Sequence, residues 1–314
     1  MKKLVLLVFI FQIVSLSCFA GKKVVFTAEK SDQTDIMIFD TEKMKPEPLV
    51  ESPFNEKHPV VSPSGDSLVF VSDNVGGFTL YKVPFPESNA TWTEIAAAAG
   101  DYTYPTWSPD GSRIAAVYAP DMEMPVSSMA IVILDPLKRV QEKVYEAPFS
   151  EEFTSLISRT QWISSDSIIF TLTEYSDYFN APRILTSTIY RLNTSDRSIH
   201  RIEGGADGFD ENGDSRGFKA SLSYFHDGKI FFAAVYGHTE RKPFIISVDG
   251  TKRTPINEIV SEDFFGPVIP VENKFLIGLQ NEAGSMTIGL FDPEKKNPEK
   301  LEFEGNARDM NLVP

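Results

Sequence analysis

Short apolar runs recur along this chain and are separated by tight, polar turns. The pattern is clearest in residues 58–70 and 104–116, which match each other in register without gaps. Each segment has one apolar run on either side of a four-residue turn, Ser62-Pro63-Ser64-Gly65 or Ser108-Pro109-Asp110-Gly111. Ser suits the first position of such a turn, Pro fixes φ at the second, and Gly adopts the left-handed conformation at the fourth. Both segments are therefore predicted to form β-hairpins.

The run after each turn is apolar on both faces, as residues 68–71 illustrate. Such a strand is expected where a sheet lies between two other sheets. Weaker copies of the turn follow at Ser165-Asp166-Ser167, His226-Asp227-Gly228 and Val271-Glu272-Asn273. Gly228 and Asn273 suit the left-handed position, whereas Ser167 does not, so the first of these copies is degenerate. Successive turns lie about 45 to 60 residues apart, which is the repeat of a four-stranded propeller blade with its loops.

The two ends of the chain supply a sixth unit. Residues 24–27 match the second strand of a blade, and residues 309–314 have the form of an inner strand that stops at the turn proline. Joining the two closes a ring and protects the sheet edges that an open array would expose. The predicted fold class is all-β: a six-bladed β-propeller of four-stranded antiparallel blades, with the C-terminal strand joining the N-terminal blade.

These repeats resemble those of the TolB-like propellers, bacterial relatives of the WD-type propellers whose signature is an S-P-D-G turn before an apolar strand. The turn at residues 108–111 carries the signature in full, and the turn at 62–65 carries it with Ser in place of Asp. The resemblance covers residues 21–314 and implies one propeller domain. No segment resembles the extra N-terminal domain of the protein that gives the family its name, so that protein's role is not implied.

The N-terminus has the order of a secretory signal. Lys2 and Lys3 precede an apolar run over residues 4–16, and a short segment follows that ends at Ala20. The run is too short to span a bilayer comfortably, because a spanning helix needs roughly 20 apolar residues. We expect residues 1–20 to be removed, which leaves an exported chain, periplasmic or secreted, without a transmembrane span. The alternative is a lipid anchor on Cys18, the only cysteine.

Charge and missing motifs narrow the function. The formal net charge is −14, so nucleic acid and anionic lipid would repel the chain. The sequence contains no G-x-S-x-G, H-E-x-x-H, G-x-x-x-x-G-K-[ST] or C-x-x-C motif. Propellers with this turn also cap prolyl-oligopeptidase-type peptidases, but here no residues remain for the separate hydrolase domain. The sequence therefore argues against a peptidase.

The repeat predicts that all long connections lie on the face opposite the S-P-x-G turns, which we call the loop-rich face. These connections are residues 119–128, 146–158, 174–188, 204–217 and 237–243. Loops on a rigid scaffold are common binding sites. One of them places Tyr175, Tyr178 and Arg183 together, with Tyr102 and Tyr104 expected nearby, and Tyr and Arg are enriched at binding hot spots.

The same register places one residue of each blade at the channel mouth on this face. Four of these are His58, Tyr104, Arg159 and Asp309; the other two blades offer Lys219 or Ala220, and Phe265 or Gly266. This ring mixes charge with aromaticity. It could hold the end of a peptide or a sugar, although polar residues also occur there simply because water fills a channel.

Metal sites are poorly supported, and we expect no cofactor. Asp210, Asn212 and Asp214 alternate like the first ligands of a calcium loop, but Ser215 and Ser221 stand where that loop needs Gly and Glu. Some TolB-like propellers are polysaccharide lyases with several metal-binding histidines in the channel. Here the register lets His58 face the channel, but not His200, His226 or His238.

The sequence therefore favours a non-enzymatic binding or scaffold propeller of the cell envelope that engages a protein or peptide through its loop-rich face. The alternative is a carbohydrate-active or other small-substrate enzyme working at the channel mouth. Acidic side chains that converge with His58 or Arg159 would favour the enzyme.

Overall fold

The computed structural model describes residues 22–87, 91–120, 128–150, 153–176, 183–204, 218–236, 240–259, 263–295 and 297–314. The predicted signal at residues 1–20 lies outside this part of the chain. Within it, no helix is long and apolar enough to cross a membrane.

The described residues form strands throughout, in six sheets. In chain order the strands are β1 (Lys23–Lys30), β2 (Gln33–Asp40), β3 (Pro46–Val50), β4 (Glu56–Val61), β5 (Ser67–Ser72), β6 (Thr79–Pro84), β7 (Thr93–Glu94), β8 (Asp101–Trp107), β9 (Ile114–Ala119), β10 (Ala130–Asp135), β11 (Val140–Glu146), β12 (Thr154–Trp162), β13 (Ser167–Ser176), β14 (Arg183–Asn193), β15 (Ile199–Gly204), β16 (Phe218–His226), β17 (Lys229–Tyr236), β18 (Glu240–Ser247), β19 (Arg253–Pro255), β20 (Phe264–Val271), β21 (Lys274–Gln280), β22 (Met286–Phe291), β23 (Glu299–Lys300) and β24 (Asn306–Leu312).

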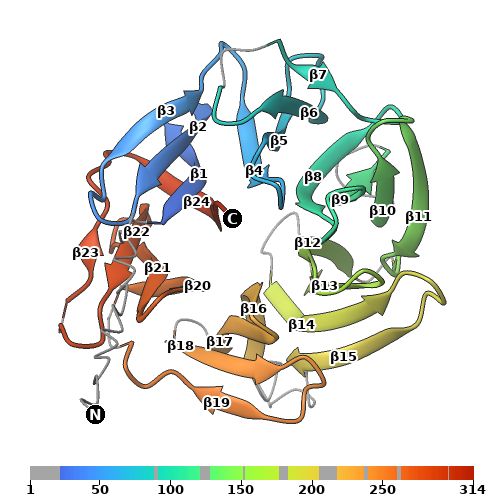
Figure 1. Ribbon diagram of the computed structural model, residues 1–314. Coiled ribbons are helices and arrows are strands. Elements are labelled where there is room, and N and C mark those ends of the chain that lie inside the picture. The colour runs from blue at the N-terminus through green and yellow to red at the C-terminus, as the bar shows by residue number, and fades with distance from the viewer. Residues whose placement is uncertain are drawn as a thin grey trace, which may run out of the picture.

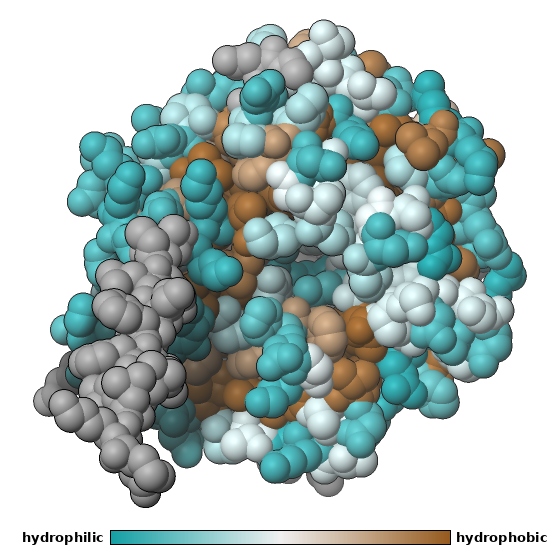
Figure 2. Space-filling view, in the orientation of Figure 1, coloured by the Kyte–Doolittle hydropathy of each residue, from teal (hydrophilic) through white to brown (hydrophobic). Residues whose placement is uncertain are grey.

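Each sheet is a blade of four antiparallel strands, and the blades surround a central axis (Figure 1). Strands β24, β4, β8, β12, β16 and β20 are the inner strands, and β3, β7, β11, β15, β19 and β23 lie at the rim. The predicted six-bladed propeller is confirmed. The space-filling view along the same direction is hollowed at the centre (Figure 2).

The core lies between neighbouring blades. The second strand of each blade is buried on both faces, as predicted; all six residues of β5 are buried. Six apolar clusters fill the six junctions between blades. Because every sheet is covered on both sides by its neighbours, the ring needs no other layer.

The hairpin turns have the predicted conformation where the sequence is most explicit. Gly65 and Gly111 have φ of 71° and 70°, and Gly228 has φ of 71°. In the full S-P-D-G turn the Ser108 hydroxyl accepts a hydrogen bond from the Arg113 amide at 2.9 Å and donates to Asp110 at 2.6 Å. Hydrogen bonds of the Ser108 and Asp110 side chains therefore stabilise the turn that contains them.

One weaker turn differs from the prediction. In the last blade the left-handed residue is Glu272, with φ of 56°, and not Asn273. The strands pair directly across this turn, Val271 with Lys274, so only two residues remain for the connection. A two-residue turn puts its first residue, rather than its second, at positive φ in the type II′ geometry.

The C-terminal strand closes the ring as predicted. Strand β24 pairs with β1 from Leu312↔Val24 to Asn306↔Glu29. Beyond the strand, the Val313 amide donates to the Lys23 carbonyl at 2.9 Å. Met310 is buried in the cluster between the first and last blades. The two ends of the chain therefore share one blade.

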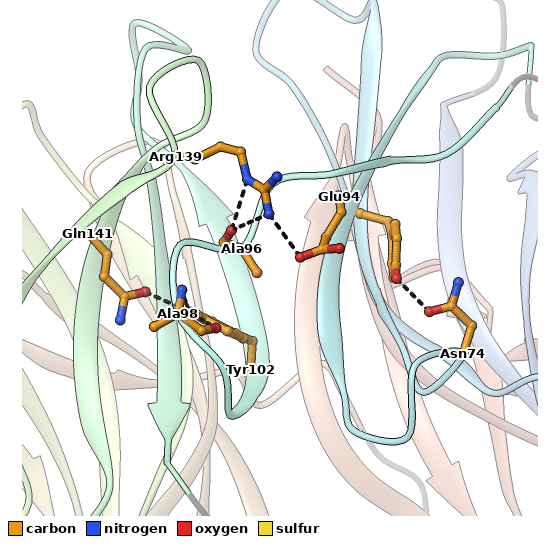
Figure 3. A network of polar contacts seen from close by, with 8 residues as sticks. Asn74, Glu94, Ala96, Ala98, Tyr102, Arg139 and Gln141 are labelled. Carbon is orange, nitrogen blue, oxygen red and sulfur yellow. Dashed lines mark hydrogen bonds and ion pairs between the residues drawn. The ribbon is translucent and has the colours of Figure 1, made fainter.

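The linker between the second and third blades shows how polar contacts hold the rim (Figure 3). Arg139 donates to the Ala96 carbonyl and pairs with Glu94 at 3.0 Å. The Tyr102 hydroxyl contacts Gln141 at 2.6 Å and the backbone of Ala98. Tyr102 is fully buried; its expected place near the aromatic loop stays a prediction, because residues 177–182 lie outside the described part of the chain.

Candidate functional site

The inner strands share a β-bulge at the level of the channel. In five blades two residues of the inner strand face one residue of its partner, and in the sixth blade three do. The pairing shifts at Lys57/Val60, Thr103/Thr106, Ser158/Gln161, Ser221/Tyr224, Phe264/Val268 and, against β1, Val25/Thr27. Bulges re-aim side chains and are frequent beside functional sites. The repetition makes the bulges a property of the blade.

Five bulges carry a left-handed residue among those described. His58, Tyr104, Arg159 and Asp309 have φ between 49° and 54°, and Gly266 has φ of 100°. The four side chains predicted for the ring therefore occupy equivalent positions. They lie within the inner strands, at the bulges, and not where these strands begin. The bulges turn these side chains toward the channel, and the sequence gives no signal for them.

The predicted ring positions of the fifth and sixth blades have different outcomes. In the sixth blade Gly266 is the left-handed residue, so of the two candidates, Phe265 and Gly266, the glycine is equivalent to His58. In the fifth blade the bulge falls between Ser221 and Tyr224, so neither Lys219 nor Ala220 is equivalent, and that expectation was wrong. The misplacement arises because the hairpin of this blade turns through two residues, Asp227 and Gly228, whereas the Ser62–Gly65 hairpin turns through four, so its glycine lies closer to the bulge.

The four polar side chains meet on one side of the channel. His58 Nδ1 lies 3.1 Å from Asp309 Oδ2, and Arg159 Nη2 lies 3.8 Å from Asp309 Oδ1. The rings of His58 and Tyr104 stack with centroids 4.1 Å apart. The side chains of His58, Arg159 and Asp309 are only 12%, 14% and 18% exposed. We call these four residues the channel tetrad.

Neighbouring blades fix the backbone of the tetrad. The His58 amide donates to the Thr27 hydroxyl at 3.1 Å, and Thr160 donates to the Tyr104 carbonyl at 2.5 Å. Asn311 donates to the carbonyl of Pro59 at 2.9 Å. Each bond joins two adjacent blades, so the tetrad is held by the ring as a whole.

The tetrad strongly shifts two pKa values. Burial alone would raise the pKa of Asp309, but the charge of His58, its hydrogen bond and the charge of Arg159 outweigh burial and hold that pKa well below its usual range. Burial, reinforced by the charge of Asp309, raises the pKa of Tyr104 to about 12. At neutral pH Asp309 is therefore an anion and Tyr104 a neutral hydrogen-bond donor.

Two cavities meet at the tetrad. One, of about 160 Å³, is lined by His58, Gln161, Tyr224 and Asn311, toward the ends of the inner strands. The other, of about 390 Å³, is lined by residues nearer the strand beginnings, including Ser158, Phe265 and Arg308. Tyr104, Arg159 and Asp309 line both. The tetrad therefore divides the channel, and we call the larger space the vestibule.

The predicted aromatic loop is only partly described. Tyr175 lies in β13, and its hydroxyl is close enough to Tyr104 to raise the pKa of the latter slightly. Arg183 begins β14 opposite Ser176, so most of the predicted loop 174–188 is strand. Tyr178 lies outside the described residues, as do the tips of the other long connections and the calcium candidates Asp210, Asn212 and Asp214.

Among the lining residues that sequence reasoning missed, Arg308, Tyr224 and Asn311 stand next to or near the ring positions. Arg308 precedes Asp309 and lines the vestibule, while Tyr224 and Asn311 line the smaller cavity. Burial raises the pKa of Tyr224 to about 12, against a hydrogen bond to the Leu312 backbone. Their proximity in sequence to the ring positions is the signal that could have pointed to them.

The histidines are placed as predicted where they are described. His58 lines the channel, His200 lies on the rim strand β15, and His226 ends β16 at a hairpin turn. His238 lies outside the described residues. The described part of the chain contains no group of three His, Cys, Asp or Glu side chains able to hold a metal ion.

The fold and the tetrad define a six-bladed propeller with a polar, divided channel. No protein-family model matches the sequence, and no curated protein matches it. Solved structures do. TolB from Acinetobacter baumannii is similar at a TM-score of 0.55 and 16% identity, over 93% of this chain and 67% of that one.

Two further structures extend the comparison. A protein from Agrobacterium tumefaciens that carries the name TolB matches at a TM-score of 0.60 and 14% identity, over 94% of this chain and 97% of that one. An oligogalacturonate lyase in complex with manganese matches at a TM-score of 0.50 and 15% identity, over 90% of this chain and 74% of that one. At these identities the likeness shows the fold alone. The TolB-like fold is thereby confirmed.

Proposed function

We propose that this chain is an exported, non-enzymatic binding propeller that engages a protein or peptide partner through its loop-rich face and the channel opening there. The observation that carries this proposal is the backbone of the tetrad. A left-handed His, Tyr, Arg or Asp costs about 1–3 kcal/mol, whereas Gly266 occupies the same position in another blade at no such cost. Strain retained at four equivalent positions is typical of a functional site.

The tetrad is also organised before any ligand arrives. Its side chains are mostly buried, and adjacent blades fix its backbone. A binding site with few freely rotating groups loses little entropy when a ligand binds. These features favour specific recognition over a channel that is merely hydrated.

The proposal is tested by comparing two glycine variants in a pull-down from cell-envelope extract. Arg159→Gly removes a tetrad side chain and relieves its backbone. Arg197→Gly relieves a left-handed arginine with φ of 60° at an exposed rim turn, so it is the matched control. We expect Arg197→Gly and wild type to capture the same partner and Arg159→Gly to lose it, with neither variant melting below wild type. Equal capture by all three would contradict the proposal.

Export belongs to the same proposal. The charged and apolar order of residues 1–20 supports removal of a signal and a periplasmic or secreted protein, with a lipid anchor on Cys18 as the alternative. Expression with the native N-terminus separates these outcomes. A mature protein that begins at Gly21 and stays in the soluble fraction supports removal, whereas a membrane-bound form that Cys18→Ala releases supports the anchor.

A second candidate is a carbohydrate-active enzyme, and one observation favours it. Asp309 converges with both His58 and Arg159, and it orients the imidazole at 3.1 Å. A His paired with a carboxylate can transfer protons, and Arg159 could bind an acidic sugar. The similar fold of an oligogalacturonate lyase makes acidic oligosaccharides, with and without manganese, the first substrates to try. Ultraviolet absorbance of a new double bond that His58→Ala abolishes would establish this function in place of binding.

A further inference from the structure

The guanidinium of Arg159 is nearly buried but incompletely paired. Its side chain is 14% exposed, and it makes no hydrogen bond to any described residue. The nearest described anion is Asp309, at 3.8 Å, whose other oxygen is held by His58 at 3.1 Å. Buried charges in proteins are normally paired and hydrogen-bonded, because desolvation is costly otherwise. Arg159 therefore has donors free for an anion in the cavity that it lines.

Arg159 does not act alone in the vestibule. Arg308 also lines it and, like Arg159, lies close enough to Tyr104 to lower the pKa of that phenol against the larger effect of burial. Arg308 pairs with Glu29 at 2.6 Å, but its side chain is 50% exposed and retains further donors. Tyr104, neutral at pH 7, presents a hydroxyl to the same space. Two arginines and a phenol thus line one cavity, together with the carboxylate of Asp309, in a chain whose net charge is −14.

The rest of the vestibule lining is partly apolar, with Ser158, Gln280 and Asp309 as its polar members. Phe265, Met286, Ile288 and Met310 line it, and the guanidinium of Arg241 stacks 3.7 Å from the Phe265 ring. The volume of about 390 Å³ lies at the low end of the range for ligand pockets. This space suits one apolar side chain beside one anionic group. A sugar would leave some of its hydroxyls without partners along the apolar part of these walls.

A polar groove continues outward from the vestibule. It lies between the last blade and the first, has a volume of about 480 Å³, and shares Met286 with the vestibule as a lining residue. Asp263, Asn281 and Asn306 line it and offer donors and acceptors suited to a peptide backbone. The two spaces together fit an extended chain whose end lies at the tetrad.

We infer that the vestibule binds the free C-terminal carboxylate of a peptide whose last residue is apolar. Arg159 and Arg308 hold the carboxylate, Tyr104 donates to it, and the apolar walls receive the last side chain. A planar guanidinium matches a carboxylate with two parallel hydrogen bonds. This inference rests on the proposed function and names the chemistry of the partner.

The test uses dye-labelled short peptides that differ only at the last residue, Leu, Phe, Ser or Asp, each as free acid and as C-terminal amide. Fluorescence anisotropy measures their binding to residues 21–314. We expect the Leu and Phe acids to bind best and their amides about tenfold or more weakly, as for loss of a charge-assisted hydrogen-bond pair. Equal binding of acid and amide, or no binding of any acid, would overturn the inference.

Variants separate recognition from folding. Arg159→Gln should weaken binding of the free-acid Leu peptide about tenfold or more and leave binding of the Leu amide unchanged. Arg159→Lys should restore part of the lost affinity. Arg308→Gln should weaken the acid by a smaller factor because the side chain is more exposed. The exposed Arg197→Gln is the control. Melting temperatures within a few degrees of wild type exclude misfolding.

Two further outcomes are informative. If an oligogalacturonate displaces the peptide acid and itself binds more tightly in an Arg159-dependent manner, the site recognises acidic sugars and the peptide inference is wrong. If no peptide binds but the envelope pull-down still captures a partner that Arg159→Gly loses, the proposed function stands and only the terminal carboxylate is wrong. If no peptide acid binds and the pull-down captures no partner that depends on Arg159, both the proposed function and the carboxylate inference are wrong.

Discussion

Glu56 should make this propeller less stable as the pH rises. The residue begins the inner strand β4 and is fully buried. Ser52 and Ser72 both donate to its Oε1, at 2.7 and 3.2 Å, while Oε2 has no partner in the described structure. Burial raises the pKa of Glu56 to about 7 against these hydrogen bonds, with added repulsion from Asp35 and Asp73.

The magnitude follows from linkage. Raising the pKa from 4.5 to about 7 corresponds to about 3 kcal/mol, at about 1.36 kcal/mol per pKa unit. Between these values the folded state keeps a proton that the unfolded state releases. The free energy of unfolding contributed by Glu56 therefore falls as the pH rises through this window and is lost above about pH 7.

The measurement is urea unfolding of wild type and Glu56→Gln at about pH 4 and about pH 9. Gln cannot ionise, so the variant should exceed wild type by about 2–3 kcal/mol at the higher pH and lie within about 1 kcal/mol at the lower. Lys57 and Glu51, the other charged groups nearby, are unchanged in both proteins. Glu142→Gln, at an exposed glutamate, is the control. A stability difference for Glu56→Gln that does not change with pH would refute the reasoning.

Three further predictions concern closure, packing and the aromatic loop. Removal of residues 308–314 exposes an edge of β1 and takes away the buried packing of Met310, so it should lower the free energy of unfolding by about 3 kcal/mol or more; a truncated protein that melts like the full chain would contradict ring closure. Gly278→Ala places a Cβ against the Gly266 carbonyl and should cost more than about 2 kcal/mol, whereas Gly289→Ala meets mainly side chains and should cost less, as urea unfolding would reveal. Replacing Tyr175, Tyr178 and Arg183 with Ala should abolish partner capture; unchanged capture with a lower melting temperature would assign these residues a structural role.

Turn chemistry explains why the blades could be predicted. The conformations of Gly65 and Gly111 are local, so Ser, Pro and Gly at fixed offsets suffice to locate them. Alignment on the turns identified His58, Tyr104, Arg159 and Asp309 as equivalent. Where the turn has a different length the alignment fails, as it does in the fifth blade, whose hairpin turns through only Asp227 and Gly228.

The bulges could not be predicted, because they contradict local preference. Left-handed φ is uncommon for Tyr and Arg, so the residue types at these positions do not indicate that conformation. Contacts from the neighbouring blade, such as Thr160 to the Tyr104 carbonyl, hold the conformation and join residues far apart in sequence. The vestibule depends on this geometry, so the role of Arg308 emerged only from the structure.

The central claim is that the tetrad is kept for binding despite its backbone cost. The direct test is isothermal titration of the captured partner against wild type and His58→Gly/Arg159→Gly, with the melting temperature of each protein recorded. The account predicts at least tenfold weaker binding by the double variant, measured at a temperature where both proteins are folded. Unchanged affinity together with a large loss of stability would show that the tetrad serves the fold and would contradict the account.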